Sequence, residues 1–245
     1  TQTAFDWRFQ FDGTRRLLPT RHPYDPKVSL SLEFDYQPPL TSVPDIHLEL
    51  MNRIQHSGTH ESYLNLISAT AELILVARAP SEDELEAARQ QGVQIETLPV
   101  ALDAFVFIVH QKNPVRNLTV DQIRTIYTGD LTQWSEVGGL DAPIHPYQRE
   151  RNSGSQETME QLVMKGQPMI EARPLEISLA MMGPFNAIRH DEQGLGYTFR
   201  YYDTFMAHMP EITTIAINGI SATPDTIQDR TYPFVSEVYL AWLSN

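Results

Sequence analysis

The sequence predicts an α/β fold, because short apolar runs typical of strands alternate with longer helical patterns along the chain. The expected strands are rich in β-branched and aromatic residues and are bounded by turn-forming residues. They are LILVA (73–77), ALDAFVFIVH (101–110), GYTFRYY (196–202) and TTIAING (213–219). No repeat or low-complexity linker separates two halves of the chain. If the fold has two domains, we therefore expect the chain to cross between them more than once.

Two helices are expected between these strands. The segment SEDELEAARQQG (81–92) begins with serine, carries acidic residues in its first turn and ends at glycine, which are start and stop signals of a helix. The segment LTVDQIRTIYTG (118–129) has the apolar spacing of a second helix.

The composition is that of a globular protein with an acidic balance. The 245 residues are 41% hydrophobic, enough for one sizeable core or two modest ones. The formal net charge of -13 argues against a general binder of nucleic acids or anionic membranes, because phosphate backbones are held mainly by clustered Lys and Arg. The lack of cysteine excludes disulfides and thiolate metal sites. No apolar run approaches the ~18 residues of a membrane span, and the start TQTAFDW predicts a mature, soluble form.

One stretch, QRERNSGSQETMEQLV (148–163), joins basic residues to Ser-Gly-Ser and then to a helical pattern. Ser153 and Gln156 stand in the Ser-x-x-Gln relation of a capping box, so we expect a helix to begin at Ser153. The first backbone N–H groups of a helix have no partner within it, and they form an anion site without any net positive charge.

The residues around this helix start suit an oxyanion. Gly154 lets a ligand approach the backbone closely, and Ser153 and Ser155 add hydroxyl donors. Arg149 can supply a two-pronged guanidinium. A well-capped turn beside two solvated arginines explains the same residues equally well, so this segment alone does not decide between the two interpretations.

The wider sequence resembles the phosphate-binding proteins of bacterial ABC phosphate uptake. The resemblance covers roughly residues 55 to 240, in order and with similar spacing. It rests on LPVALDAFVFIVHQKNPVRNLTVDQIRTIYTGDLTQWSEVGG, IHPYQRERNSGSQETMEQLVM, GLGYTFRYY and TIAINGISATPDTIQDRTYPF. It implies a two-lobed type II periplasmic-binding-protein fold with the ligand in the cleft between the lobes. It also implies export, followed by lipid anchoring or release into a periplasm.

The resemblance nominates ligand-binding residues where the motifs match. Arg149 stands where the family has an arginine that pairs with phosphate, and Ser153, Gly154 and Ser155 stand at the helix start that donates to it. Upstream, FDGTRRLLP (11–19) is similar to the family's Asp-Gly-Ser-Thr loop, which implies that Thr14 and Arg15 lie beside the ligand. HSGTHESYLNLI (56–67) matches another ligand-facing turn and helix start, nominating Gly58, Thr59 and His60.

Arg78 is a departure from the family pattern. After the strand in AELILVARAPS (71–81), the family has an acidic residue that accepts a proton from phosphate and helps to exclude sulfate, and here Arg78 falls at that place. If Arg78 faces the cleft, the site favours the more highly charged ligand form and discriminates less against sulfate. If its side chain turns away, Arg78 is structural.

The sequence gives less support for a catalytic site or a metal site than for an oxyanion site. His56 and His60 have the i, i+4 spacing of two metal ligands, but Gly58 between them breaks a helix, so no metal or other cofactor is expected. Ser153 and Ser155 lack the GxSxG elbow of a nucleophile, and no base can be assigned, so an enzyme is not expected. Asp103 is interpreted as a structural acid where the chain crosses between lobes.

The expected organisation follows from the two segments that look like crossings, ALDAFVF and GYTFRYY. They place one lobe at residues 1–103 together with 203–245, and the other lobe at 104–202. The predicted function is capture of inorganic phosphate, or a related oxyanion, by a periplasmic or extracellular monomer that delivers it to a membrane ABC permease. Two alternatives stay open: a phosphate-sensing or adhesive module with the same fold, and a phosphate-ester hydrolase.

Overall fold

The computed structural model describes residues 21–22, 25–29, 54–55, 57–150, 153–171, 182–207 and 209–244. The chain divides into two compact units, Thr1–Ser57 and Gly58–Asn245. In the first unit, β1 (Arg21–His22) pairs antiparallel with β2 (Asp25–Ser29). The fold and the site described below belong to the second unit.

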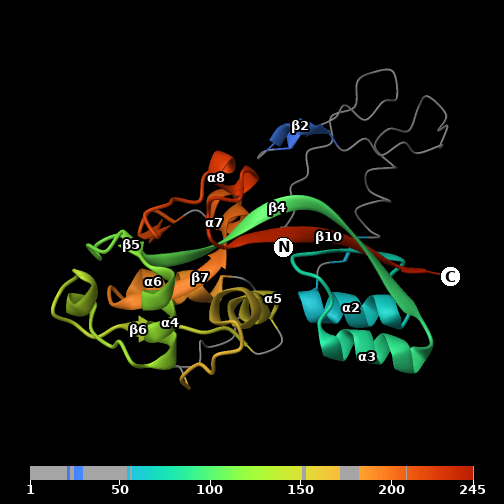
Figure 1. Ribbon diagram of the computed structural model, residues 1–245, viewed down its shortest axis with the longest axis horizontal. Coiled ribbons are helices and arrows are strands. Elements are labelled where there is room, and N and C mark those ends of the chain that lie inside the picture. Colours follow the sequence, from blue (N-terminus) through green and yellow to red (C-terminus); the bar gives the residue numbers. More distant parts are fainter. Residues whose placement is uncertain are drawn as a thin grey trace. The chain divides into compact units, whose positions relative to one another are not determined.

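A six-stranded sheet runs through the second unit in the order β3-β10-β4-β7-β6, and β8 pairs with β4 as well (Figure 1). Its pairs are antiparallel except for β6 with β7. The strands are β3 (Leu73–Val76), β4 (Gln94–His110), β6 (His145–Pro146), β7 (Gly194–Phe199), β8 (Ile212–Thr214) and β10 (Val235–Ser244). A separate parallel pair joins β5 (Asn117–Leu118) to β9 (Ala216–Ile217).

The helices follow the strands in the alternation that the sequence predicts. They are α2 (Thr59–Ile67), α3 (Glu82–Gln91), α4 (Val120–Thr128), the 3-10 helix η1 (Trp134–Val137), α5 (Gly154–Thr158), the π-helix η2 (Met159–Met164), α6 (Gly183–His190), α7 (Arg200–Phe205) and α8 (Pro224–Gln228). The two predicted helices, α3 and α4, are confirmed with their stop signals: Gly92 and Gly129 end them at φ 71° and 87°. In the described part of the chain, no helix has both the length and the apolar character needed to cross a bilayer.

Two main hydrophobic cores lie toward opposite ends of the shared strand β4, and a third, smaller cluster is formed by Ile108, Phe185, Ile188 and Ala207. β4 is 17 residues long, and its first part pairs with β10 while its last part pairs with β7 and β8. Its second half, Ala104–Val109, is fully buried, as a continuous apolar run predicts. Around this half lies the larger core. The smaller core lies between α2 and the strands β3 and β10, where Tyr63 and Leu66 pack against Ile74 and Ala241. The two cores give the unit its two lobes.

The core contacts divide the chain differently from the sequence expectation at its C-terminal side. The expectation assigns all of 203–245 to the first lobe. In the structure, Ile215, Ile227 and Phe234 pack in the larger core, together with residues of 104–202. The expected lobe boundaries stay a prediction, and these contacts place the segment before β10 in the larger core. β10 runs back beside β4, and the two strands form one long antiparallel ribbon joining the lobes (Figure 1).

A second difference concerns the end of GYTFRYY. The predicted strand stops at Phe199, and α7 begins at the next residue. The physical reason is a tertiary cap: the buried carboxylate of Asp103 accepts a hydrogen bond from the N–H of Tyr201 at 3.1 Å and from that of Ala104 at 2.8 Å. Asp103 thus ties the crossing strand β4 to the first turn of α7, which agrees with its interpretation as a structural acid.

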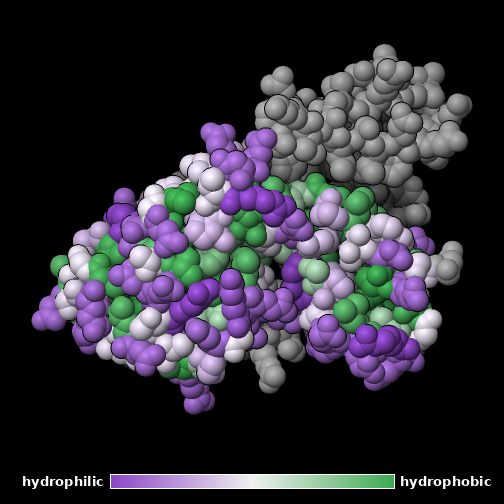
Figure 2. Space-filling model, viewed as in Figure 1, coloured by the Kyte–Doolittle hydropathy of each residue, from purple (hydrophilic) through white to green (hydrophobic). Residues whose placement is uncertain are grey.

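The visible face of the unit is mostly polar, with hydrophobic residues interspersed among charged ones (Figure 2). This pattern is ordinary for a globular protein, because polar groups never cover the whole surface. The described large hydrophobic side chains that remain exposed are Ile54, Leu64, Leu73, Leu75, Leu98, Leu140 and Phe205.

Candidate functional site

The start of α5 forms as predicted in one respect and differs in another. Ser153 is the N-cap, and its hydroxyl accepts a hydrogen bond from the N–H of Gln156 at 3.1 Å. The reciprocal half of a capping box is replaced, because the Gln156 side-chain oxygen accepts from the N–H of Arg149 at 2.9 Å. The helix continues directly into the π-helix η2, a local widening that is often found at functional sites. Gln156 therefore links the helix start to the segment after β6 that carries Arg149.

Tyr197 completes this link. Its hydroxyl accepts a hydrogen bond from the N–H of Arg149 at 3.0 Å and donates one to the side-chain oxygen of Gln156. Tyr197 is 1% exposed, and burial raises the pKa of its hydroxyl, so it stays protonated and able to donate. The backbone of Arg149 is thereby fixed at a defined place relative to α5.

The guanidinium of Arg149 is half-buried and has no counter-ion in the described part of the chain. Its side chain makes no hydrogen bond or ion pair with any described residue, and burial lowers its pKa. Two tyrosine hydroxyls, of Tyr197 and Tyr202, lie near enough to influence its charge, as does Glu150. A desolvated cation in this state gains strongly from an anion that can accept two parallel N–H bonds.

The start of α2 lies against the start of α5. A Cβ atom added at Gly154 would meet the Oγ1 atom of Thr59 at 2.5 Å and its Cβ atom at 3.0 Å. Thr59 is the first residue of α2, and Gly58 is its N-cap without any side-chain cap. Each helix start has N–H groups without a partner inside its own helix. The unit therefore brings two sets of backbone donors together, one from each lobe.

The structure thus gathers Thr59, Ser153, Gly154 and Ser155, and it joins Arg149 to them through Gln156. Ser155 is buried, at 4% exposure. Thr14 and Arg15, nominated from the N-terminal motif, lie outside the described residues.

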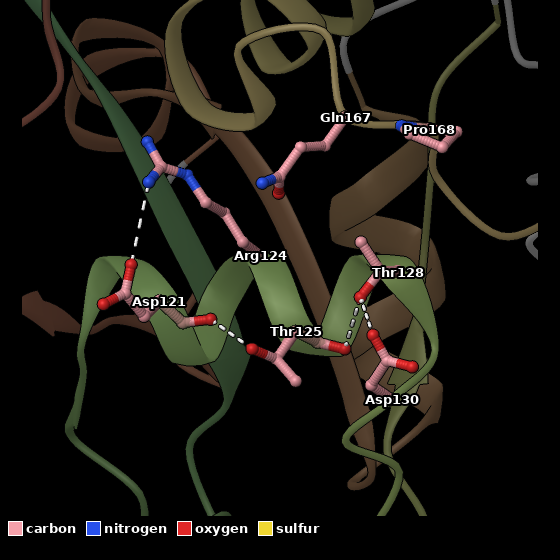
Figure 3. Close-up of a pocket in the computed structure, with 7 residues that line it drawn as sticks. All are labelled: Asp121, Arg124, Thr125, Thr128, Asp130, Gln167 and Pro168. Carbon is pink, nitrogen blue, oxygen red and sulfur yellow. Dashed lines mark hydrogen bonds and ion pairs between the residues drawn. The ribbon is translucent and has the colours of Figure 1, made fainter.

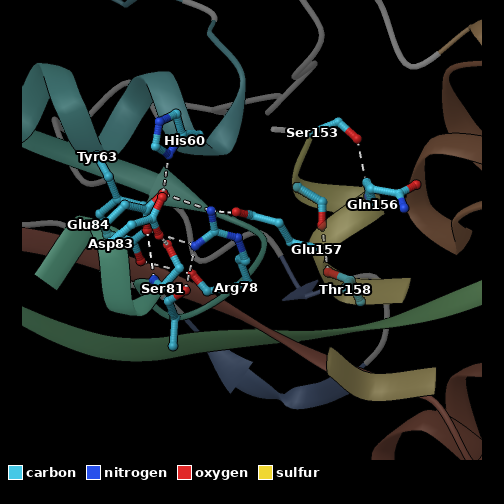
Figure 4. A network of polar contacts seen from close by, with 12 residues as sticks. His60, Tyr63, Arg78, Ser81, Asp83, Glu84, Ser153, Gln156, Glu157 and Thr158 are labelled. Carbon is cyan, nitrogen blue, oxygen red and sulfur yellow. Dashed lines mark hydrogen bonds and ion pairs between the residues drawn. The ribbon is translucent and has the colours of Figure 1, made fainter. Parts of the chain in front are cut away.

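Arg78 has a different set of partners from the expected oxyanion. Its two terminal nitrogens donate to the two carboxylate oxygens of Glu84, each at 2.8 Å (Figure 4). It also forms an ion pair with Glu157 of α5 and donates to the carbonyl oxygen of Ala79 at 2.8 Å. The guanidinium lies over the ring of Tyr63, 5.6 Å from its centroid.

Arg78 is 6% exposed and Glu84 is fully buried, so the cation and its first partner are both withdrawn from water. With two carboxylates around it, Arg78 offers little net positive charge to a ligand. The role of Arg78 as an oxyanion ligand stays a prediction, and these contacts favour the structural interpretation.

Three side chains around Arg78 have the composition of a metal site. His60, Glu84 and Glu157 each offer a ligand atom, and these atoms lie within 4.8 Å of one another. The Nδ1 atom of His60 lies 3.0 Å from a carboxylate oxygen of Glu84. The guanidinium of Arg78 already supplies the cation for both carboxylates, and a metal ion there would be repelled by it. The other histidine considered from the sequence, His56, lies outside the described residues.

A shallow cavity of about 390 Å³ lies on the other lobe, beside α4 (Figure 3). Its charged and hydroxyl groups bond to near neighbours: Arg124 donates to the carbonyl oxygen of Val163 at 2.7 Å, and Thr128 donates to Asp130 at 2.8 Å. Because these groups are already hydrogen-bonded to their neighbours, the cavity lacks the free converging donors of the α5 region. It is lined by Asp121, Arg124, Thr125, Thr128, Asp130, Gln167 and Pro168.

Sequence reasoning missed three residues of the site region. Gln156 is recognised as a capping residue, but nothing in its spacing indicates that it reaches Arg149. Tyr197 lies 48 positions along the chain from Arg149, so its contact depends on the pairing of strands. Glu157 looks like an ordinary acidic residue in a first helical turn, and only the packing of the lobes brings it to Arg78.

Comparison with known proteins identifies the family. Residues 39–244 match the family model described as a PBP superfamily domain. The chain is 23% identical over 196 residues to protein SphX of Synechococcus elongatus, covering 75% of this chain and 57% of SphX. It is 24% identical over 216 residues to the phosphate-binding protein PstS of Pseudomonas aeruginosa, covering 80% of this chain and 64% of PstS. The chain thus spans less than two thirds of the length of these relatives.

Solved structures show the same fold. A Clostridium perfringens substrate-binding protein, described as belonging to a phosphate ABC transporter and holding phosphate, aligns with a TM-score of 0.64 at 24% identity, covering 76% of this chain and 71% of that one. An ABC-type phosphate transport receptor from Vibrio cholerae aligns with a TM-score of 0.62 at 24% identity, covering 82% and 80%. The predicted two-lobed type II periplasmic-binding-protein fold is confirmed.

Proposed function

Because the chain belongs to the PBP superfamily, we propose that it binds inorganic phosphate, or a closely related oxyanion, and passes it to the membrane permease of an ABC transporter. The names of the bacterial relatives support phosphate as the ligand, since PstS is called a phosphate-binding protein and the C. perfringens structure holds phosphate. Binding without turnover fits the site, where the described serines Ser153 and Ser155 have no histidine or carboxylate bonded to their hydroxyls.

The observation that carries this proposal is the guanidinium of Arg149, half-buried without a counter-ion among the described residues, on a residue whose backbone N–H is bonded to Gln156 of α5. A lone desolvated arginine costs free energy unless an anion joins it. Phosphate provides that anion, and its oxygens match the planar, two-pronged arrangement of the guanidinium donors.

The remaining ligand contacts are proposed from the same geometry. The N–H groups of Gly154 and Ser155 and the hydroxyls of Ser153 and Ser155 approach the anion from one lobe, and Thr59 approaches it from the other. Both helix starts present the positive ends of their dipoles to the same place. The chain can therefore hold an oxyanion despite its net charge of -13, because the positive potential is local.

We place this activity outside the cytoplasm, in a periplasm or at an outer cell surface, because a binding protein must meet its ligand before the permease does. The protein acts as a monomer that opens and closes its lobes by a hinge motion.

The test is isothermal titration calorimetry of phosphate-free protein with inorganic phosphate, sulfate and a series of phosphomonoesters. Saturable one-to-one binding of phosphate is the expected result. The absence of heat with every oxyanion would contradict the proposal, and release of phosphate from an ester would indicate a hydrolase instead.

A further inference from the structure

Glu157 links the two lobes through charge. It lies in α5, directly after the proposed ligand-binding turn, and the residues that follow it pack into the larger core. Its ion-pair partner Arg78 follows β3 in the other lobe, where the hydroxyl of Tyr63 donates to the Arg78 carbonyl oxygen at 2.9 Å. Figure 4 shows the Glu157 side chain reaching from α5 toward Arg78, which lies between Glu157 and Glu84.

Arg78 does not depend on Glu157 for a counter-ion. Glu84 receives both of its terminal nitrogens, and Glu84 is itself fixed because its Oε2 atom accepts the N–H of Ser81 at 2.8 Å. This arrangement belongs entirely to one lobe and can persist when the lobes separate. The pair between Arg78 and Glu157 can form only when α5 lies against that lobe.

Burial acts most strongly on the pKa of Glu157, and Arg78 opposes it through both charge and hydrogen bonding. Burial raises the pKa of Glu157, and the nearby carboxylates of Glu84 and Asp83 raise it further, while Arg78 alone lowers it. His60 of α2 also faces this cluster through its contact with Glu84. A buried ion pair of this kind contributes little to the free energy of unfolding, and while it is formed its two partners are held in contact.

We propose that Glu157 is a positioning residue for oxyanion binding: by pairing with Arg78 of the other lobe, it sets the start of α5 against the start of α2. The inference rests on the proposed function, since the positioned groups are the proposed phosphate donors. Gly154 and Thr59 touch only when the two helix starts lie this close together. A methyl group at position 154 would already collide with Thr59. If the pair is lost, the donor groups of the two lobes are held less firmly relative to each other, although every donor is still present.

The test compares the wild-type protein with Glu157→Gln and Glu157→Lys. Hydrogen–deuterium exchange without ligand reports on residues 154–164 and 59–67, and stopped-flow measurements give the phosphate dissociation rate. We expect Glu157→Gln to speed exchange in both segments and to raise the dissociation rate about tenfold, because loss of a desolvated charge contact acts mainly on dissociation. Glu157→Lys places a like charge beside Arg78 and should have the larger effect. The unfolding temperature of Glu157→Gln should stay the same or rise.

The matched control is Glu86→Gln. Glu86 pairs with Arg89 within α3 on an exposed surface, so this change removes an ion pair with an arginine inside one lobe. It should leave exchange in both segments and phosphate binding unchanged. Unchanged exchange at α5 in Glu157→Gln, or a marked fall in its unfolding temperature with unaltered dissociation, would refute the positioning role. If no variant and no wild-type protein binds phosphate, the proposed function fails, and exchange alone then decides whether Glu157 positions α5.

Discussion

Arg78 and Glu84 form a two-pronged ion pair in which each terminal nitrogen of the arginine meets its own carboxylate oxygen at 2.8 Å. Glu84 has no exposed surface, and Arg78 has almost none. Within this pair the arginine is the partner that Glu84 cannot lose, because no water reaches the carboxylate to replace it.

The variant Arg78→Leu should therefore be strongly destabilised. It leaves the carboxylate of Glu84 buried without its counter-ion, which we expect to lower the free energy of unfolding by about 3–5 kcal/mol. Urea unfolding followed by tryptophan fluorescence measures the change. The double variant Arg78→Leu with Glu84→Gln should recover part of the loss, since the buried charge is then absent. A single variant as stable as the wild type would show that the pair is solvated in solution.

Arg149→Ala should weaken phosphate binding by roughly 2–5 kcal/mol, because it removes a charge-assisted contact in a desolvated site. The fold should change little, since only the backbone N–H of Arg149, and not its side chain, bonds to Gln156 and Tyr197. Calorimetry gives the affinity, and circular dichroism checks the helix content. Phosphate affinity equal to that of the wild type would place the oxyanion elsewhere.

Gly154→Ala should weaken phosphate binding through its contact with Thr59. Alanine is otherwise the better helix former by about 1 kcal/mol, so without the contact the change would stabilise α5. Here the new methyl group meets Thr59 Oγ1 at 2.5 Å and must displace the Thr59 side chain at the start of α2. In a Thr59→Ala background, the same substitution should cost less affinity. Equal costs in both backgrounds would mean that the helix starts do not touch in solution.

The buried carboxyl group of Asp103 should make the free energy of unfolding depend on pH. Burial raises its pKa to about 6, above that of the unfolded chain. Its contribution to stability is therefore fully present below the unfolded-state pKa of about 4 and is lost as the pH rises through about 6. Asp103→Asn keeps an oxygen for the N–H of Tyr201 but cannot ionise. The stability of this variant relative to the wild type should rise by about 2–3 kcal/mol between pH 4 and pH 7. A relative stability that does not change with pH would contradict the raised pKa.

The sequence predicted most elements whose signals are local. The helices at Glu82–Gln91 and Val120–Thr128 carry their own caps, and the strand Leu73–Val76 carries its own apolar pattern, so each could be predicted without knowledge of the rest of the fold. Residues 200–202 were predicted as strand because their aromatic residues favour it. They form a helix because Asp103, almost a hundred positions earlier, caps its first turn.

The site divides in the same way. The N-cap at Ser153 could be predicted, because a helix start is encoded in consecutive residues, whereas the role of Arg149 as a phosphate ligand stays a prediction. The partners of Arg78 could not be predicted, since Glu84 reaches it through the packing of α3 and Glu157 through the approach of the other lobe. The pairing of β8 and β9 could not be predicted for a related reason: they pair with strands far earlier in the sequence, and no local pattern shows which strands they choose.

The ribbon of β4 and β10 has a mechanical consequence. Both strands that pass between the lobes belong to it, and they are hydrogen-bonded to each other from Ala104 with Val235 to Gln94 with Ser244. Rotation of one lobe against the other must therefore bend two hydrogen-bonded strands together, whereas separate loops could turn independently. The ribbon has one soft place, a register shift between Val238 and Tyr239 that leaves Val100 without a partner in β10, next to Pro99, which has no N–H to give to the ladder. Stiffening or softening that place alters the elastic energy of lobe rotation without touching a single residue near the oxyanion.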